Sequence, residues 1–363
     1  MKIIKTFKFK LEPTKEQIEK IEWTLDMCRW LYNSALEQRR IAWDKYGISL
    51  TRYKQQAELP NLKKEIPEFK GVYGQVLQDV IKRLDLAFQS FFRRVKNGEK
   101  PGYPRYKGKG RYDSFTYPQL GFKIEGKYLK LSKIGLIRIK LHRQIEGKIK
   151  TCTIRRKNGK YYACITCEIE QEQKPKTGKA VGIDLGVKHL AITSDGQFFP
   201  NHKYLKKSER KIKYLQRMVS RRKLGSNRRK KAVLLLAKEW ERVANRRKDL
   251  AHKISRKLVD NYDLIAFEDL NIQGMVKNHN LAKSILDASW KMLVEFTSYK
   301  AEWAGKKVVL VDPRNTSQVC SECGEIVKKT LSDRVHSCSC GYTADRDVNA
   351  ARNILKRALQ EIA

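Results

Sequence analysis

A single aspartate within an apolar segment restricts the folding of this chain more than any other sequence feature. Residues 180–186 read AVGIDLG, a pattern that predicts a short buried strand, and Asp184 lies there between Ile183 and Leu185. A carboxylate in a central strand costs roughly several kcal/mol to desolvate unless it is paired or bound to a metal ion. We therefore expect Asp184 to have a cationic partner.

A second acid closes another apolar strand. Glu268 is the last residue of LIAFE within YDLIAFEDL, and strand alternation turns the next residue, Asp269, to the other face. Either acid alone is equally well explained as the mark of a strand end. Together, and in this order, Asp184 and Glu268 are typical of nuclease sites in which acids at neighbouring strand ends bind two divalent ions. Mg²⁺ (or Mn²⁺) is the expected metal because hard cations prefer oxygen ligands.

The third acid of such a site is ambiguous, because the last expected helix starts with Asp345, Arg346 and Asp347. Residues two apart on a helix point about 200° apart, so the two carboxylates cannot face one metal ion. Asp345 suits the N-cap position, and Asp347 lies at the edge of the expected buried stripe. We therefore predict that Asp347 completes the catalytic set. The expected buried stripe consists of Val348, Ala351, Ile354, Leu355 and Ala358.

Four cysteines in two short turns predict a structural zinc site. Fourteen residues separate Cys320 and Cys323 from Cys338 and Cys340, and a glycine follows each pair. Four thiolates suit tetrahedral Zn²⁺ and close its coordination sphere. His336 remains open as a substitute ligand, and disulfides or unbound core cysteines remain the alternatives.

Another CxxC sequence, Cys164 to Cys167, has a different expected role. It lies in a predicted strand, where an odd offset sends the two side chains to opposite faces. No second pair follows at a ribbon-like spacing. We therefore predict that these two cysteines pack in a core and bind no metal.

The charge of the chain points to a polyanionic partner. Lys and Arg number 78 against 39 Asp and Glu, which leaves a net charge of +39. Self-repulsion of this size favours a protein that nucleic acid normally neutralises, although charge does not choose between DNA and RNA. Residues 1–13 contain no continuous apolar run, and no later segment offers about 18 uncharged apolar residues. We therefore expect a cytoplasmic protein that is neither exported nor bound to a membrane.

Two segments carry the charge in patterns typical of nucleic-acid binding. Residues 96–118 alternate basic residues and glycines with aromatic residues, so cations can bind phosphates while rings stack on unpaired bases. A flexible loop with tyrosines packed beneath it is the alternative. Residues 203–260 predict long helices whose charges are mostly of one sign, which favours a phosphate-binding surface. The candidate contacts are Tyr103, Arg105, Tyr106, Lys107, Lys109, Arg111, Tyr112, Arg221, Arg222, Arg228 and Arg229.

The order of expected elements predicts an α/β protein of several domains. Residues 2–12 alternate as a short strand, and residues 13–99 read mainly as helices. Residues 120–170 read as a β-meander. From residue 180 the order is strand, hairpin, helices, strand, helix, strand and helix, which is the order that a ribonuclease-H-like domain needs.

Four motifs give the chain a recognisable likeness. GIDLGVKHLAITSDG, FEDLNIQGM, TSQVCSECG and DRDVNAARNIL occur in this order. With them, the chain resembles the TnpB (OrfB-type) proteins of bacterial and archaeal insertion sequences, which are compact relatives of the type V CRISPR effectors. The resemblance covers essentially the whole chain. It places the catalytic acids at Asp184, Glu268 and Asp347, and the zinc ligands at the four cysteines of residues 320–340.

The resemblance implies an RNA-guided DNA endonuclease. A guide RNA from the end of the element pairs with one DNA strand, the protein reads a short adjacent motif, and one RuvC-like site cuts the double-stranded target. The protein is expected to act as a monomer with its RNA, near the nucleoid of a prokaryotic cell. A transposase performing strand transfer, a guided DNA-binding repressor and a structural RNA-binding protein are the alternatives.

The resemblance also implies a division into modules. The expected modules are a wedge-like β-barrel from residues 1–12 and 100–172, a helical recognition lobe from residues 13–99, a RuvC-like (RNase H-like) nuclease domain from residues 179–315 and 342–363, and a zinc ribbon inserted at residues 316–341.

Overall fold

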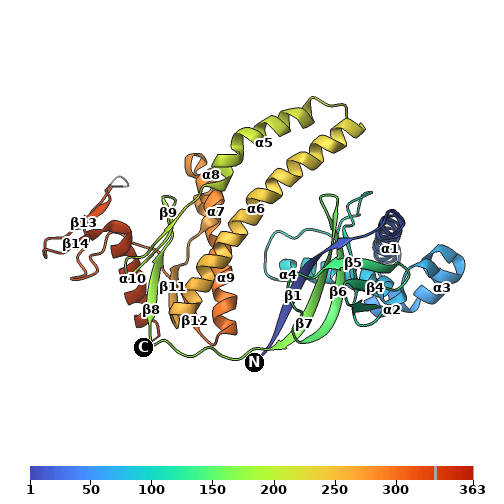
Figure 1. Ribbon diagram of the computed structural model, residues 1–363, viewed down its shortest axis with the longest axis horizontal. Coiled ribbons are helices and arrows are strands. Elements are labelled where there is room, and N and C mark those ends of the chain that lie inside the picture. Colours follow the sequence, from blue (N-terminus) through green and yellow to red (C-terminus); the bar gives the residue numbers. More distant parts are fainter. Residues whose placement is uncertain (331–332, 363) are drawn as a thin grey trace. The chain divides into compact units, whose positions relative to one another are not determined.

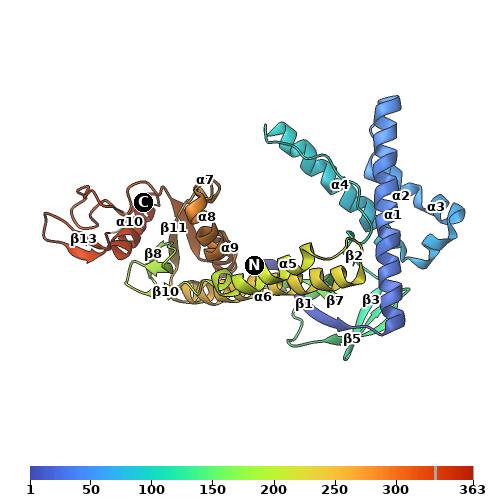
Figure 2. The ribbon, with the colours of Figure 1, turned by 90° about the horizontal axis from the view of Figure 1, so that it is seen from above.

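The computed structural model describes residues 1–330 and 333–362 of the chain. Two compact units are present (Figures 1 and 2). One runs from Lys2 to Glu170, and the other contains Met1 and the residues from Gln171 onward. No helix within the described residues is long and apolar enough to cross a membrane.

The first unit contains a seven-stranded antiparallel sheet in which the N-terminal strand lies at the centre. Strand β1 (Lys2–Glu12) pairs with both β5 and β7, although more than 100 residues separate it from either strand in sequence. The strand order is β2-β6-β7-β1-β5-β4-β3. The remaining strands are β2 (Ser114–Tyr117), β3 (Phe122–Glu125), β4 (Tyr128–Leu131), β5 (Gly135–Lys140), β6 (Lys148–Lys157) and β7 (Lys160–Glu170).

Helices follow β1 directly. The side chain of Thr14 caps α1 (Lys15–Tyr46), and Gln17 bonds back to the Thr14 backbone, so the two residues form a capping box. The amphipathic α4 (Gly74–Lys96) packs on α1, and its buried residues include Val76 and Leu84. Between them lie α2 (Arg52–Ala57), α3 (Leu59–Glu65) and the 3₁₀ helix η1 (Pro67–Gly71).

The second unit is built on a five-stranded mixed sheet with the order β10-β9-β8-β11-β12. Strand β8 is antiparallel to β9 and parallel to β11, and β11 is parallel to β12. The hairpin expected around residues 194–196 joins β9 and β10. These strands are β8 (Ala180–Asp184), β9 (His189–Thr193), β10 (Phe198–Pro200), β11 (Leu264–Glu268) and β12 (Lys307–Val311).

Helices cover both faces of this sheet. Ile183 and Phe267 belong to a large core that also contains residues of α6, α8 and α9. On the opposite face, Ala266 packs against Ile354 and Ala358 of α10. The helices of this unit are α5 (Tyr204–Ser220), α6 (Asn227–Asn261), α7 (Ile272–Met275), α8 (His279–Ala288), α9 (Trp290–Trp303) and α10 (Arg346–Gln360).

Gly182 explains how α10 comes so close to the central strand. A Cβ atom on Gly182 would lie 2.0 Å from the carbonyl oxygen of Ala351 and 2.6 Å from the backbone nitrogen of Leu355. Only a residue without a side chain allows this contact. Since strand residues two apart share a face, Asp184 lies on the same side of the sheet as α10.

Candidate active site and metal centre

Asp184 and Glu268 lie at the same edge of the sheet. Each is the last residue of its strand, and the parallel register pairs Ile183 with Phe267, so each acid directly follows one member of this pair. The sequence suggested that Asp184 lies inside its strand, whereas β8 ends at this residue. The difference matters because a side chain at the end of a strand can contact a ligand at the edge of the sheet, whereas a side chain inside a central strand cannot.

Asp347 reaches this edge from the first turn of α10. Asp345 is the N-cap, as predicted: its carboxylate accepts hydrogen bonds from the backbone N–H groups of Asp347 at 2.9 Å and Val348 at 3.3 Å. Asp345 is exposed and Asp347 half-buried. Arg346 forms an ion pair with Asp347, with 3.1 Å between Nε and Oδ1.

The buried stripe of α10 differs in part from the one expected. Ala351, Ile354 and Ala358 are buried, whereas Val348 and Leu355 are only half-buried. Asn349 and Asn353 are buried instead, and their amides hold the chain that precedes α10. Periodicity of apolar residues gives no signal for such asparagines.

The charges of the other two acids act on Asp184. Burial raises the pKa of Asp184 well above its usual range, and the negative charges of Glu268 and Asp347 raise it further. The Arg346 guanidinium acts in the opposite direction. Burial also raises the pKa of Glu268. The hydrogen bond from the Thr316 hydroxyl and the charge of Arg357 lower this pKa in part. A divalent cation is the partner that would relieve this clustering of negative charge.

Thr316 is a member of this site that sequence reasoning missed. Its side chain is buried, and its Oγ1 donates a hydrogen bond to Oε1 of Glu268. Thr316 begins the TSQVCSECG motif, so the sequence shows that it precedes the first cysteine. The sequence does not show that Thr316 contacts Glu268, because the two residues are 48 positions apart.

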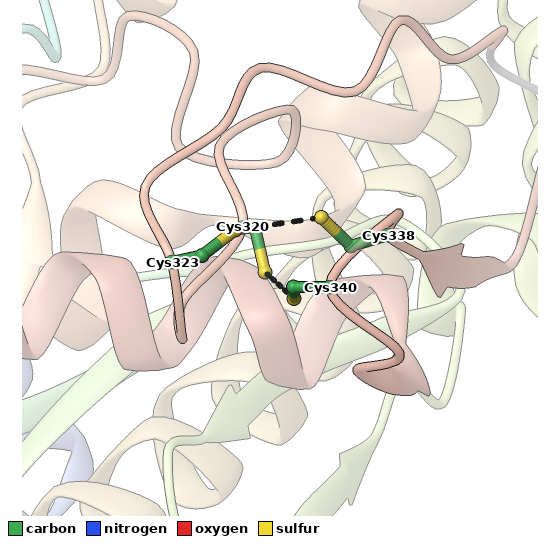
Figure 3. A group of neighbouring side chains, drawn as sticks. All are labelled: Cys320, Cys323, Cys338 and Cys340. Atoms are coloured by element: carbon green, nitrogen blue, oxygen red, sulfur yellow. Dashed lines mark hydrogen bonds between the residues drawn. The ribbon is translucent and has the colours of Figure 1, made fainter.

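The four cysteines of residues 320–340 converge at one point (Figure 3). Their sulfur atoms all lie within 4.8 Å of one another. The distances are 3.8 Å from Cys320 to Cys340 and 3.5 Å from Cys323 to Cys338. Zn–S bonds of about 2.3 Å in a tetrahedron place the sulfurs roughly 3.8 Å apart, so the arrangement fits Zn²⁺. Among the described residues, the three carboxylates do not form an equally tight cluster.

The surroundings of the cysteines bear on the alternatives to a site of four thiolates. All eight cysteines are free, so no disulfide forms. His336 is fully buried. Its Nδ1 contacts the Lys329 ammonium, and its side chain hydrogen-bonds to Cys320, so it borders the group of four sulfurs without being a member of it. Cys167 is buried in the sheet of the first unit, and Cys164 faces the other side of that sheet. Within the described part of the chain, neither belongs to the group of residues that could hold a metal ion.

The residues around the cysteines form a small knuckle fixed to α10. Strands β13 (Val335–Ser337) and β14 (Thr343–Asp345) pair in antiparallel fashion and lead into the helix. Asn349 donates to the Val319 carbonyl at 2.8 Å and accepts from the Ser321 N–H at 2.9 Å. The knuckle is therefore attached to the helix that carries Asp347.

The tyrosines of residues 96–118 are less available than the sequence suggested. Tyr112 is 7% exposed and packs against Tyr32, with ring centroids 6.2 Å apart, so its ring cannot stack on a base in this structure. Tyr103 is half exposed, but its ring packs edge-on against Phe88 at 5.5 Å. The Tyr106 hydroxyl bonds to Glu37. Packing of the tyrosines was the alternative interpretation of this segment.

The cations of the same segment are more open. Arg105, Lys109 and Arg111 are exposed. The backbone of Lys107 is fixed to Asn33 of α1 by two hydrogen bonds, at 2.8 and 3.0 Å. The segment is therefore held against α1 while the charged side chains around it face solvent.

The basic helices of the second unit form the hairpin α5–α6 (Figure 1). The four candidate arginines lie at the turn of this hairpin. Arg221 and Arg228 are exposed, while Arg222 and Arg229 are half-buried. The Arg222 guanidinium donates to the Arg228 carbonyl at 2.5 Å, which holds the turn together.

The fold of the second unit defines a class of protein. The sheet order, the helices on both faces and the knuckle inserted before the last helix are those of an RNase H-like nuclease of the RuvC type. Among solved structures, a Cas12f1–sgRNA–target DNA complex aligns with a TM-score of 0.62 at 13% identity, over 97% of this chain and 98% of the other. A mini-RNA-guided endonuclease, CRISPR-Cas_phi3, aligns with a TM-score of 0.52 at 10% identity, over 98% and 92%.

Sequence comparisons give the family. Residues 164–279 match the family described as "Probable transposase", and residues 290–354 match the "Cas12f1-like, TNB domain". A "Putative RNA-guided DNA endonuclease" of Streptomyces pristinaespiralis is 33% identical over 98% of this chain and 89% of its own length. InsQ of Escherichia coli K12, which carries the same description, is 33% identical over 98% and 92%. The chain belongs to the TnpB (OrfB-type) family.

One match carries a name that the structure does not bear out. Residues 1–47 match a "Helix-turn-helix domain". In the structure this range holds the strand β1 and the single long helix α1, with no second helix. The name of this match therefore gives no reason to expect a helix in the DNA major groove.

Proposed function

We propose that this protein is an RNA-guided DNA endonuclease of a transposable element, with Asp184, Glu268 and Asp347 as its metal-binding catalytic residues. The observation that carries the proposal is the electrostatic clustering of three acids drawn from two strand ends and a helix start. It occurs in a chain whose relatives, named for this activity, align over 98% of its length.

The roles of the residues follow from their positions. A divalent cation, Mg²⁺ or Mn²⁺, would supply water activation and stabilisation of the leaving oxygen. Asp184 and Glu268 would hold it from the ends of adjacent strands, and Asp347 would close the site from α10. Arg346 pairs with Asp347 and lowers the pKa of Asp184, so it offsets part of the negative charge.

The other modules would bind the nucleic acids. We assign residues 1–12 and 100–172 to a wedge-like module and residues 13–99 to a recognition lobe for the guide RNA and the target duplex. The second unit would contain the nuclease domain, residues 179–315 and 342–363, with the zinc ribbon at 316–341. The exposed arginines at the α5–α6 turn suit contact with phosphates. Such a complex would act on DNA in the cytoplasm of a prokaryotic cell, at the nucleoid.

Two other functions use the same parts differently. A transposase would join DNA ends with the same carboxylate chemistry, and a guided repressor would bind its target without cutting. The family descriptions favour cleavage over either. An assay that separates joined from hydrolysed ends distinguishes strand transfer, and cleavage in the presence of metal distinguishes repression.

The test begins with the RNA that copurifies with the protein. We expect sequencing to give one discrete RNA whose variable end specifies a DNA target. A duplex matched to that end should be cut in Mg²⁺, and a duplex with a scrambled target should not. Protein that purifies free of RNA and cuts both duplexes equally would contradict the guided function.

A further inference from the structure

Thr316 connects the two metal centres of the second unit. Its side chain is 4% exposed, and its hydroxyl donates to Oε1 of Glu268, an acid that is itself 8% exposed. A hydroxyl donor occupies one oxygen of this carboxylate and fixes its orientation, which leaves the remaining lone pairs for a metal ion. Four residues further along the chain lies Cys320, the first sulfur of the knuckle.

Buried asparagines determine where Thr316 lies. The amide of Asn353 donates to the carbonyl of Thr316 at 2.8 Å and to that of Val319 at 2.6 Å. Asn349, one turn earlier on α10, holds Val319 and Ser321 on either side of Cys320. The Lys356 ammonium also contacts the Ser321 carbonyl. The segment from Thr316 to Ser321 is thus fixed at both ends to α10.

The arrangement gives a continuous path from the knuckle to the nuclease site. A folded knuckle fixes Cys320, the asparagines of α10 align the backbone before it, and the Thr316 hydroxyl meets Glu268. Partners of this kind, which orient a metal ligand without touching the metal, typically change metal affinity by about 10–100-fold when removed.

We propose that Thr316 is a positioning residue that orients Glu268 for the catalytic divalent ion, and that through Thr316 the folded knuckle sets the metal affinity of the nuclease site. The inference rests on the proposed function, because it takes Glu268 as a metal ligand. It goes further in assigning a role to a residue outside the acids and the cysteines. It also assigns to the knuckle an effect on metal affinity in addition to its contribution to the stability of the fold.

The experiment measures Mn²⁺ binding to the purified protein–RNA complex by calorimetry, alongside its zinc content. Thr316→Val removes the hydroxyl with little change in shape, and Thr316→Ser retains it. Thr343→Val is the matched control, since Thr343 lies in the same knuckle with an exposed side chain. We expect Thr316→Val to weaken Mn²⁺ binding by about 10–100-fold. Thr316→Ser should recover most of the affinity, Thr343→Val should match the wild type, and all should retain zinc.

The outcomes separate this inference from the function on which it rests. Asp184→Ala measures the decrease expected when a metal ligand is removed. Weak binding by Asp184→Ala together with wild-type binding by Thr316→Val overturns the role of Thr316 alone. Equal weakening in Thr316→Ser and Thr316→Val also overturns it, because the hydroxyl would then not be responsible. Unchanged Mn²⁺ binding in Asp184→Ala contradicts the catalytic metal site itself.

Discussion

The two proposed metal centres of the second unit are built in opposite ways. The proposed zinc ligands come from one stretch of 21 residues, Cys320 to Cys340, and their sulfurs lie within 4.8 Å of one another. The acids come from β8, β11 and α10, more than 160 residues apart at the extremes. They form a looser group, in which the charges of Glu268 and Asp347 raise the pKa of Asp184. The first centre is local and closed, while the second is assembled by the fold and open.

This difference shows what each centre requires from the rest of the molecule. A closed set of thiolates makes a compact knuckle from short turns and its ion. The carboxylate site exists only while α10 lies across β8, because Asp347 belongs to that helix. The knuckle contacts α10 through Asn349 and Asn353. The cysteine site therefore helps to hold the helix that carries Asp347 of the carboxylate site.

Loss of zinc should have the largest effect among the changes that leave the three acids intact. We expect Cys320→Ser, or chelation of the wild type, to remove the zinc and to reduce cleavage by about 10–100-fold, because both Glu268 and Asp347 lose their support. Asp347 lies in the first turn of the helix that follows the knuckle, and the hydrogen bond from Thr316 extends the effect to Glu268. Zinc content and cleavage rate are the measurements, with Cys164→Ser as the matched control. Zinc-free protein with full activity would show that the centres are independent.

Gly182→Ala tests the close approach that joins α10 to the sheet. The new methyl group would meet Ala351 and Leu355 backbone atoms at 2.0 and 2.6 Å. Overpacking of this kind destabilises by about 1–3 kcal/mol, which should lower the melting temperature and the cleavage rate together. Gly108→Ala is the control, since its nearest neighbour would be 3.9 Å away. A variant as stable as the wild type would mean that α10 is free to move off the strand.

The raised pKa of Asp184 predicts a variant that is more stable but inactive. The folded state holds this proton more tightly than the unfolded state does, so metal-free stability falls as the pH rises above about 4. At pH 7 and without divalent ions, Asp184→Asn should melt higher by about 2–4 °C. The gain should shrink toward pH 4, where the wild-type carboxyl is protonated.

Melting curves from pH 4 to 8 measure this effect, with Asp269→Asn, at the exposed acid that follows Glu268, as the control. Saturating Mg²⁺ should stabilise the wild type and not Asp184→Asn. A wild type that melts above Asp184→Asn at pH 7 without metal would contradict the clustering of charge at this site.

The smallest effect should come from a surface that neither centre touches. Replacing Arg221 and Arg228 at the α5–α6 turn with alanine should weaken nucleic-acid binding several-fold. The slope of log affinity against log salt concentration should become shallower by about one for each phosphate that is no longer neutralised. Zinc content and Mn²⁺ affinity should not change. Lys291→Ala, which removes an exposed cation on α9, is the control. An unchanged salt dependence in the arginine variant would show that the α5–α6 turn does not bind nucleic acid.

Local sequence patterns were enough to predict much of this arrangement. Strand alternation predicted β1, and helix geometry separated the N-cap Asp345 from Asp347. These features depend on neighbours within a few residues, where the backbone period decides which side chains share a face.

The features that were missed depend on interactions between distant segments. Thr316, Asn349 and Asn353 are polar residues whose burial is explained only by partners brought together by the fold. Tyr112 looked like a stacking ring within a basic loop, yet it is buried against Tyr32 of α1. The type of a residue shows which interactions it can make, and its packing in the fold determines whether it is exposed enough to make them.

The most direct test compares cleavage by the wild type and Asp184→Ala on a duplex matched to the copurified RNA. The proposed site predicts that Asp184→Ala retains the RNA and the zinc but cuts at least about 10³-fold more slowly in Mg²⁺. Asp269→Ala, at the exposed acid that follows Glu268, should cut at the wild-type rate. Full cleavage by Asp184→Ala would contradict the assignment of the three acids as the catalytic metal site.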